Sequence, residues 1–265
     1  MKQIFFLLLL PFAMLSGPAT AQSESTHADA DVPALAADQR DLLREEIRAY
    51  LLEHPEVILE AIELLEERRE SAATNADRAL VASHSEAIFN DGYSHVGGNP
   101  EGDVTLVEFI DYRCGFCRRA HPEINELVET DPNLRVVVKE FPILGPESVA
   151  VGRMALAALE IDSDRYGALS DALMEHQGDL TETAGYLIAK QAGFNVSELK
   201  EAAQSETVAE RLSMNYQLAQ ALGLQGTPSF ILGGEIIRGY IPLAEMRDRI
   251  SEARAGAGAA DQAQN

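Results

Sequence analysis

Cysteine is scarce in this sequence and tryptophan is missing: the 265 residues contain two cysteines, Cys114 and Cys117. An exported chain normally uses cysteines as structural staples. Here a single pair is present, so no structural disulfide competes with Cys114 and Cys117 for another role. Their close spacing, with two residues between them, favours reversible redox chemistry over stapling.

Positive charge is scarce as well. Lysine and arginine number 21 against 43 aspartates and glutamates, which gives a formal net charge of −22 at pH 7. Such acidity repels nucleic acid and anionic membrane surfaces, although it says nothing about the fold. We therefore expect no nucleic-acid partner.

Long hydrophobic runs are confined to the start of the chain. Residues 1–21 combine a positively charged start, an apolar run from Ile4 to Leu15 and small residues before Gln22, which is the pattern of a cleaved secretory signal. The run is too short to span a bilayer comfortably, and no later segment is apolar enough to do so. The sequence predicts cleavage near Ala21-Gln22, no membrane insertion of the mature chain, and an exported, oxidising compartment.

Two segments precede the main domain. Residues 22–37 are rich in Ala, Ser and Asp without periodicity, and are expected to form a disordered leader. Residues 38–92 show helical periodicity with a break at His54-Pro55. The narrow apolar stripe of these helices either packs on the chain's own domain or buries the stripes of other protomers. We favour the second interpretation, an oligomerisation stalk through residues 38–70.

The remaining pattern alternates strands and helices. Its predicted elements are a loop over 97–103, a strand over Val104–Ile110, a helix from Cys117 to about Thr130, a strand over Leu134–Glu140, a helical block over about 146–222, a hairpin around Gly233-Gly234 and a helix from Pro242 to about Arg254. A tail over 255–265 is expected to be disordered. This order predicts an α/β domain over residues 93–254 with a thioredoxin fold and an inserted helical domain.

Cys114 and Cys117 directly follow the first predicted strand, at the start of a helix. Free backbone N–H groups and the positive end of the helix dipole acidify a cysteine at this position. The dipole supplies at most about 2 kcal/mol, so a pKa shift of several units also needs hydrogen bonds to the sulfur. We predict that Cys114 is the exposed nucleophile and that Cys117, one turn further, is more buried and resolves the mixed disulfide. This chemistry is that of a thiol–disulfide oxidoreductase and requires no cofactor.

Metal binding is the competing interpretation of the two cysteines. Half of a zinc site would need further ligands from scattered histidines and carboxylates, which makes zinc the weaker hypothesis. Capture of Cu(I) by the reduced Cys114 and Cys117 stays open, because soft thiolates favour this ion.

Glu108 shares the strand parity of Leu106 and Ile110, which predicts a carboxylate facing an apolar interior. Buried acids are costly and tend to be functional. Glu108 is therefore predicted to move protons to and from Cys117. The alternative is a solvent-facing residue paired with Lys139 on the neighbouring strand.

Several side chains around the cysteines have weaker signals. Arg113, Arg118 and Arg119 form either a basic collar that supports the thiolate at long range or an ordinary solvated helix face. Phe116 brings no positive charge, so a less extreme acidification is expected than a histidine there would give. His121 is expected to be a surface or packing residue.

Thr227-Pro228 precedes the apolar residues of the predicted hairpin. A trans bond would be the default for this pair alone, but the strand–helix layout favours a cis bond. Placed opposite the cysteines, this loop leaves the backbone groups of Thr227 free to pair with an extended substrate. Thr227, Pro228 and Phe116 are the predicted substrate contacts.

At this point the residues resemble a known family. Cys114-Gly115-Phe116-Cys117, the acid Glu108 six residues earlier, and Thr227-Pro228 are similar to the redox motif, buried acid and cis-proline loop of the DsbA family of the thioredoxin superfamily. The helical block resembles the inserted domain of that family. The stretch from about Asp38 to Leu65 resembles the N-terminal region of ScsC proteins, associated with suppression of copper sensitivity.

The resemblance implies a periplasmic dithiol–disulfide oxidoreductase that acts on cysteine-containing exported proteins. Some ScsC relatives oligomerise through this N-terminal region and shuffle wrong disulfides, which implies an isomerase or reductant that a membrane reductase keeps reduced. The alternatives are a monomeric oxidase, kept oxidised by a quinone-linked membrane partner, a Cu(I)-binding copper-tolerance protein, and a non-catalytic scaffold.

Overall fold

The computed structural model describes residues 36–262. The predicted signal over 1–21, and all but the last two residues of the predicted leader, lie outside the described residues. The chain divides into two compact units, Met1–Ala61 and Ile62–Asn265. No helix among the described residues is both long and apolar enough to cross a membrane.

The described part of the first unit is helical, as predicted. Helix α1 spans Ala37–Glu53, and α2, which spans Glu56–Ser83, begins in this unit. The break falls at the predicted His54-Pro55, where proline disfavours a helical conformation of the residue before it. Helix α1 buries none of its residues, so its apolar side chains stay exposed. The large ones are Leu42, Leu43, Ile47, Tyr50 and Leu52.

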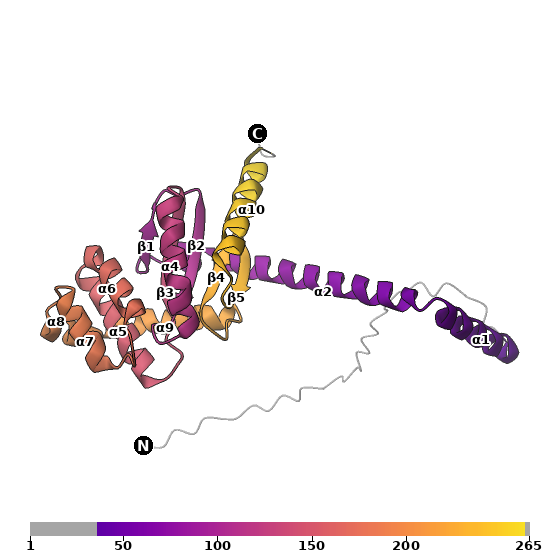
Figure 1. Ribbon diagram of the computed structural model, residues 1–265, viewed down its shortest axis with the longest axis horizontal. Helices are drawn as coiled ribbons and strands as arrows, with labels where there is room; N and C mark the ends of the chain where they lie inside the picture. The colour runs from indigo at the N-terminus through magenta and orange to yellow at the C-terminus, as the bar shows by residue number, and fades with distance from the viewer. Residues whose placement is uncertain (1–35, 263–265) are drawn as a thin grey trace, which may run out of the picture. The chain divides into compact units, whose positions relative to one another are not determined.

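A mixed five-stranded sheet organises the second unit (Figure 1). Its strands are β1 (His95–Gly98), β2 (Val104–Ile110), β3 (Leu134–Glu140), β4 (Ser229–Leu232) and β5 (Glu235–Arg238). They lie in the order β1-β3-β2-β4-β5, with β2 and β3 parallel and the other neighbouring pairs antiparallel. Strand β2 lies in the centre and is buried on both faces, which explains its nearly continuous apolar sequence.

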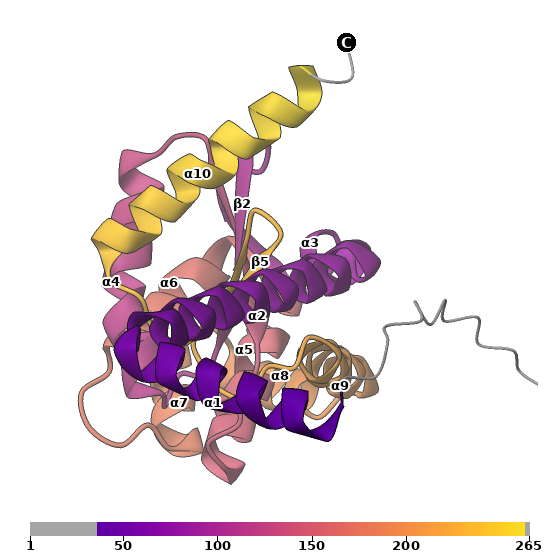
Figure 2. The same cartoon turned by 90° about the vertical axis from the view of Figure 1, so that its right-hand side faces the viewer.

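Helices cover both faces of the sheet. On one face lie α4 (Gly115–Thr130) and α10 (Leu243–Gln262), and on the other lie α3 (Ser85–Phe89) and α9 (Glu206–Ala221) (Figure 2). Strand β2 divides its side chains accordingly. Leu106 packs in the core beneath α4 and α10, whereas Val107 and Phe109 pack in the core beneath α3 and α9.

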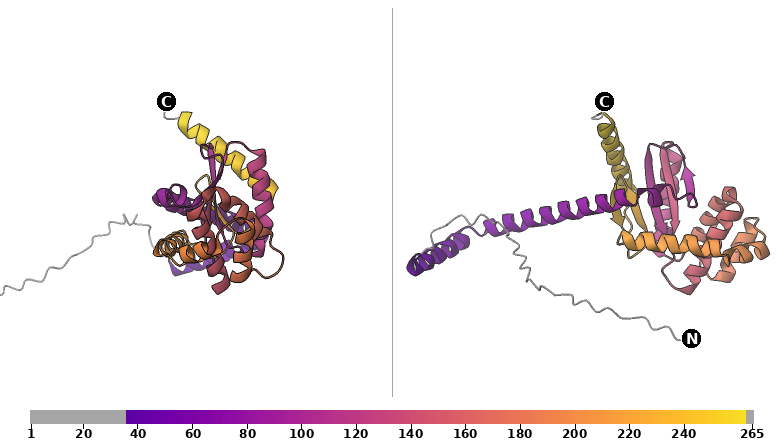
Figure 3. Two further views of the ribbon diagram at one scale, coloured as in Figure 1. Left: turned by 90° about the vertical axis from the view of Figure 1, so that its left-hand side faces the viewer. Right: turned by 180° about the vertical axis from the view of Figure 1, so that it is seen from behind.

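The inserted helical domain is confirmed, and its helices lie within residues 146–221. It consists of α5 (Pro146–Ile161), α6 (Ser163–Glu175), α7 (Glu182–Gln191), α8 (Val196–Ala203) and α9, which runs back to the sheet (Figure 3). Its core is continuous with the end of β2, because Ile110, Tyr112, Cys114 and Cys117 belong to the same apolar cluster as α5 and α6. The insertion therefore forms one wall around the two cysteines.

The prediction of a loop over 97–103 is wrong for its first two residues. Gly97 and Gly98 belong to β1, which pairs antiparallel with the free edge of β3. At Gly98 the backbone has φ +66°, and a Cβ would lie 2.4 Å from the carbonyl oxygen of Leu134. Glycine concealed the strand because the partner edge, and not local propensity, holds it in place.

The prediction of a disordered tail over 255–265 is wrong as far as Gln262, where α10 ends. Arg254 at the expected helix end is held by Asp103 and Asp131, with nitrogen–oxygen distances of 2.9 Å. The alanines that follow favour continuation of a helix, and they outweigh the glycines among them.

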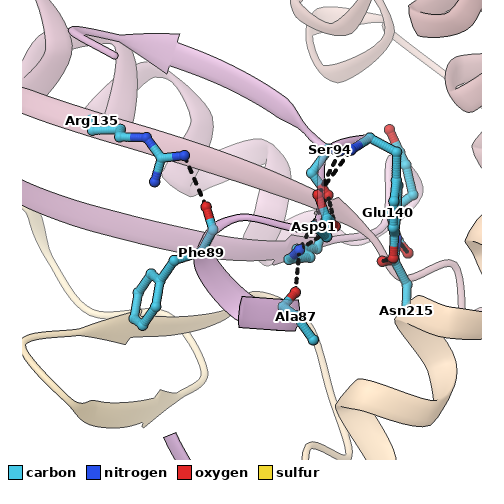
Figure 4. A network of polar contacts seen from close by, with 9 residues as sticks. Ala87, Phe89, Asp91, Ser94, Arg135, Glu140 and Asn215 are labelled. Carbon is cyan, nitrogen blue, oxygen red and sulfur yellow. Dashed lines mark hydrogen bonds and ion pairs between the residues drawn. The ribbon is translucent and has the colours of Figure 1, made fainter. Parts of the chain in front are cut away.

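A buried ion pair fastens the segment between α3 and β1 to the sheet. The Lys139 side chain on β3 is fully buried, and its Nζ lies 2.5 Å from Asp91 Oδ2. The same Nζ donates to the carbonyl oxygen of Ala87 at 2.8 Å. Asp91 also accepts from the backbone and the hydroxyl of Ser94, and Figure 4 shows these groups gathered around the carboxylate. Lys139 is therefore not the partner of Glu108.

We predict that Asp91→Ala lowers the free energy of unfolding by about 3–5 kcal/mol, because it leaves a buried ammonium without its partner. Urea unfolding measures the loss. The matched control is Glu126→Ala, which breaks the half-exposed Arg247–Glu126 pair and should cost about 0–1 kcal/mol. Equal losses in the two variants would show that the buried pair does not hold this segment.

Candidate active site

Strand β2 delivers the first cysteine to the tip of a helix. After Ile110 the chain turns, and Cys114 becomes the N-cap of α4 with an extended backbone, φ −76° and ψ 119°. Its amide donates to the carbonyl oxygen of Asp111 at 2.9 Å, which closes the turn. The sulfur of Cys114 thus lies beside the unpaired amides of the first helical turn, as predicted.

The carboxylate of Asp111 holds this turn in place. One oxygen accepts from the amide of Arg113 at 2.8 Å and from the hydroxyl of Ser148 at 2.9 Å. The other accepts from the amides of Ile143 and Leu144, in the connection between β3 and α5, at 2.9 and 3.0 Å. Asp111 is 1% exposed, so these bonds replace the water it has lost. The sequence reasoning missed this residue.

Cys114 is strongly acidified. A hydrogen bond from the Cys117 thiol is the largest cause, and Thr227 and the amides of Cys117 and Phe116 add to it, so that the pKa of Cys114 falls to about 5 despite burial. Nearly all of this sulfur is then thiolate at neutral pH. Its accessibility differs from the expectation of an exposed nucleophile, because Cys114 is only 7% exposed. Its Sγ lies 3.1 Å from the carbonyl oxygen of Thr227, a residue far away in the sequence.

Cys117 has the opposite character. It is completely buried, and the pKa of its thiol is raised, first by the hydrogen bond it makes to Cys114, then by burial and by the charge of Glu108. Cys117 therefore keeps its proton while Cys114 gives its proton up. One sulfur is ready to attack and the other must be deprotonated before it can react.

Glu108 faces the interior, as its strand parity predicts. It is 5% exposed, and desolvation raises its pKa to about 7, although His121 nearby lowers it. Its proposed partner in the alternative interpretation, Lys139, binds Asp91 instead. A carboxyl group that titrates near neutrality beside a protonated thiol is suited to exchange protons with it.

Glu140 is a second buried acid that the sequence reasoning missed. It ends β3, is 2% exposed, and accepts hydrogen bonds of 2.8 Å from the hydroxyls of Tyr112 and Tyr166. Desolvation raises its pKa to about 8. Its backbone oxygen accepts from Asn215 of α9 (Figure 4). The signal was available, because Glu140 shares the strand parity of the buried Leu134.

The Thr227–Pro228 peptide bond is cis, as predicted. The loop brings the carbonyl oxygen of Thr227 to Cys114, and the backbone N–H of Thr227 makes no hydrogen bond to any described residue. Beside the loop lies a cavity of about 470 Å³, whose lining includes Gln225, Arg238 and Gly239. A backbone donor next to the reactive sulfur is thus left open to a ligand.

The predicted basic collar is not a set of free charges. Arg113 pairs with Asp179 at 2.6 Å. Arg118 donates to the carbonyl oxygens of Tyr112 and His176 at 2.7 and 3.0 Å, which ties the end of α6 to the active-site turn.

The third arginine belongs to an aromatic surface. Arg119 lies over the ring of Tyr240 at 4.4 Å from its centroid. Phe116 also stacks on Tyr240, at 6.3 Å between ring centroids, and is 58% exposed next to Cys114. Phe116 is therefore placed where a substrate side chain would contact it.

His121, expected to be a surface or packing residue, is largely buried in the structure. Its side chain is 13% exposed, and its Nε2 lies 2.9 Å from Asp171 Oδ1. The structure thus brings Cys114, Cys117, Glu108 and the Thr227 loop together, with His121 behind them. Among residues 36–262 there is no group of three or more His, Cys, Asp or Glu side chains that could hold a metal ion.

The raised pKa of Glu108 predicts a pH-dependent gain in stability for Glu108→Gln. The pKa of Glu108 in the folded protein, about 7, lies above the ordinary value of 4.5. At pH 4 the carboxyl group is protonated in the folded protein, and its burial does not lower the stability. Above pH 7 it is ionised, and the full penalty of burying the charge lowers the stability. The difference corresponds to about 3 kcal/mol. Urea unfolding should give equal stabilities for variant and wild type at pH 4, and a more stable variant at pH 8. The control Glu101→Gln, on the surface, should show no such divergence; a pH-independent difference for Glu108→Gln would contradict a buried, titrating acid.

Comparison with known proteins agrees with this geometry. A family model described as thioredoxin matches residues 90–252. A second, described as the N-terminal domain of the copper resistance protein ScsC, matches residues 39–72. The chain spans about a quarter of the length of the curated relatives it matches, such as Na(+)/H(+) antiporter NhaA 1 of Salinispora arenicola, 27% identical over 164 residues, 61% of this chain and 25% of that protein.

Solved structures cover the chain more fully. A thioredoxin-like oxidoreductase from Silicibacter pomeroyi DSS-3 is 40% identical, with a TM-score of 0.62 over 64% of this chain and 97% of that chain. A periplasmic thioredoxin-like protein from Salmonella enterica serovar Typhimurium is 30% identical, with a TM-score of 0.59 over 64% and 95%. Proteus mirabilis ScsC in a transitional conformation is 28% identical, with a TM-score of 0.63 over 84% and 98%. The chain therefore belongs to the thioredoxin family, and its residues 39–72 match the N-terminal domain of ScsC.

Proposed function

We propose that this protein is a thiol–disulfide oxidoreductase that acts on exported proteins through Cys114 and Cys117. The placement of the two cysteines carries the proposal: Cys114 is the N-cap of α4, and Cys117 is fully buried in the first turn of that helix. The hydrogen bond between them lowers the pKa of Cys114 to about 5 and raises that of Cys117. This difference in pKa makes Cys114 the attacking thiolate and Cys117 the thiol that resolves the mixed disulfide.

The chemistry follows from that difference. The Cys114 thiolate attacks a substrate disulfide, forms a mixed disulfide and releases one substrate thiolate. Cys117 then gives its proton to Glu108, attacks the Cys114 sulfur and releases the second substrate thiolate. The substrate disulfide is reduced to two thiols while Cys114 and Cys117 are oxidised to a disulfide. The reverse sequence oxidises a substrate dithiol. If another thiolate of the substrate attacks the mixed disulfide before Cys117 does, a new substrate disulfide forms and Cys114 leaves as a thiolate, which reshuffles the substrate's disulfides.

The surface around Cys114 supports a protein substrate. The open N–H of Thr227 offers a hydrogen bond to an extended backbone, as edge-strand recognition requires. The exposed ring of Phe116 offers apolar contact beside the sulfur. Both features favour an unfolded or extended segment over a small molecule.

We propose that the protein reduces or isomerises substrate disulfides and does not mainly oxidise substrate dithiols. This direction is supported by the match of residues 39–72 to the ScsC N-terminal domain and by the exposed apolar side chains of α1. We propose that α1 and the start of α2 join copies of this chain into a homo-oligomer, because a stripe of this kind is buried by its counterparts. The alternative is a monomeric DsbA-type oxidase.

Periplasmic action fits the secretory signal that the sequence predicts over 1–21 and the periplasmic solved relative. In that compartment, turnover requires a redox partner in the membrane, a reductase for the isomerase or a quinone-linked oxidase for the alternative.

A second candidate function is Cu(I) binding by the reduced thiols, which the copper resistance description of the matching N-terminal domain favours. Soft thiolates suit this ion. Tight, stoichiometric Cu(I) uptake that is lost on changing either cysteine, in a protein without exchange activity, would support it over the first proposal.

Alkylation of the mature, reduced chain tests the redox proposal. We predict that the rate at Cys114 falls to half its maximum near pH 5, because the thiolate is the reacting species. Cys117→Ser should trap a mixed disulfide with glutathione on Cys114, and Cys114→Ser should abolish exchange. Free glutathione under the same conditions is the control. A Cys114 that reacts no better than this free thiol at pH 6 would overturn the proposal.

Charge substitution in the stripe tests the oligomer. The double variant Leu43→Glu with Ile47→Glu should sediment as a monomer and lose the ability to refold a scrambled disulfide substrate, while exchange with glutathione persists. Arg44→Glu with Arg48→Glu, at the same spacing outside the stripe, is the matched control and should keep the wild-type mass. A monomeric wild-type protein would favour the oxidase instead.

A further inference from the structure

A cavity with both polar and apolar lining includes the buried Glu108, and neither the two cysteines nor Thr227 line it. It encloses about 200 Å³ and is lined from β1, β2, β3, α4 and α6. Its polar lining includes Glu108, His121, Asn125 and Asp171. A site of this size and polarity has room for several water molecules with hydrogen-bond partners. The cavity therefore connects the buried acid of the active site with side chains nearer the surface.

Glu108 at the inner end of the cavity needs such a connection. It is 5% exposed, and no described residue makes a hydrogen bond to its carboxyl group. A proton that Glu108 takes from Cys117 cannot remain on Glu108, because the carboxyl group must be deprotonated again before the next turnover. The proton has to cross the cavity.

His121 occupies the outer part of this path. Its side chain is 13% exposed, while that of Asp171, bound to its Nε2 at 2.9 Å, is 49% exposed. The pair thus reaches from the cavity to solvent. A histidine has two ring nitrogens, so it can receive a proton at one and release a proton from the other.

We propose that His121, oriented by Asp171, carries protons between Glu108 and solvent during disulfide exchange. This proposal rests on the proposed function. His121 acts through Glu108 and does not contact the reacting sulfurs, so it is a positioning residue for proton transfer and not a catalytic one.

The step balances as follows. In the mixed disulfide, Cys117 loses its proton to Glu108 and its sulfur bonds to that of Cys114, while the bond between Cys114 and the substrate breaks. The substrate leaves as a thiolate that carries the electron pair of the broken bond. Glu108 then passes the proton through cavity water to His121, and His121 releases a proton to solvent beside Asp171.

The other groups around His121 are less suited to this role. From α6, the hydroxyl of Tyr166 is already bound to Glu140, and that of Ser170 lies 3.3 Å from Tyr112. On α4 itself, Asn125 carries no titrating proton.

His95 of β1 is the remaining titratable group in the cavity apart from Glu108 and Asp171. Its ring packs on Tyr166 at 4.6 Å between centroids, and burial lowers its pKa. No carboxylate contacts it directly among the described residues, whereas His121 has Asp171. His121 is therefore the better exit.

Single-turnover kinetics test the proposal. The reduced mature chain is mixed with glutathione disulfide, and acid quench with alkylation follows the conversion of the mixed disulfide on Cys114 into the Cys114–Cys117 disulfide. We expect His121→Ala to slow this step by about tenfold to a hundredfold, the order contributed by a positioned proton-transfer group. Added imidazole should restore the rate. The equilibrium constant with glutathione should stay at its wild-type value, because a relay changes rates alone.

Two further variants complete the design. Asp171→Asn keeps the imidazole but loses its orienting charge, and should slow the step less than His121→Ala; it also serves if His121→Ala does not fold. His84→Ala, which removes a histidine outside the cavity, is the matched control and should leave the rate unchanged.

The outcomes separate the two proposals. Wild-type rates in both His121→Ala and Asp171→Asn would overturn the relay while the redox function stands. A slow step with an altered equilibrium constant and no imidazole rescue would assign His121 a structural or electrostatic role, which also overturns the relay. A wild-type protein that never forms the mixed disulfide would overturn the proposed function itself.

Discussion

The hydrogen bond between the two sulfurs is the interaction on which the rest of this site depends. A helix N-terminus stabilises one thiolate by a limited amount, about 2 kcal/mol at best. The donor from Cys117 supplies the largest part of the remaining stabilisation of Cys114, and the same bond holds the proton on Cys117. The protein thereby has one reactive sulfur and one protected sulfur, with no cofactor in the proposed chemistry. The surrounding structure holds these two sulfur atoms within hydrogen-bonding distance of each other.

Two buried carboxylates fasten the elements around the two cysteines. Asp111 binds the active-site turn to the connection between β3 and α5 through four hydrogen bonds, so the helical insertion and the sheet share one rigid corner. Asp91 and Lys139 fasten the segment before β1 to β3, near the C-terminal end of that strand. Both acids are satisfied by donors, which is the condition under which a buried charge is tolerated.

The buried acids behind the cysteines are held differently. Glu108 lacks a direct hydrogen bond among the described residues, whereas Glu140 receives two from tyrosines. Burial raises the pKa of each acid, to about 7 for Glu108 and to about 8 for Glu140, although the tyrosine hydrogen bonds oppose the shift of Glu140. An acid in this state can accept and release a proton near physiological pH. The inserted helices supply Tyr166 and Asp171, which means that the insertion contributes to the chemistry of the site as well as covering it.

The sequence by itself determined the elements whose signals are local. Apolar runs predicted β2 and β3, helical periodicity predicted the helices, and the paired cysteines located the reactive turn. Strand parity alone predicted that Glu108 is buried. The sequence could not place β1, because the edge of β3 holds that strand in place. Tertiary structure alone decided that Lys139 binds Asp91, that Thr227 partly covers Cys114, and that His121 faces Glu108 across a cavity with Asp171 at its rim. Each of these contacts joins residues far apart in the chain, and their distances follow from how the helices pack on the sheet and not from any local pattern.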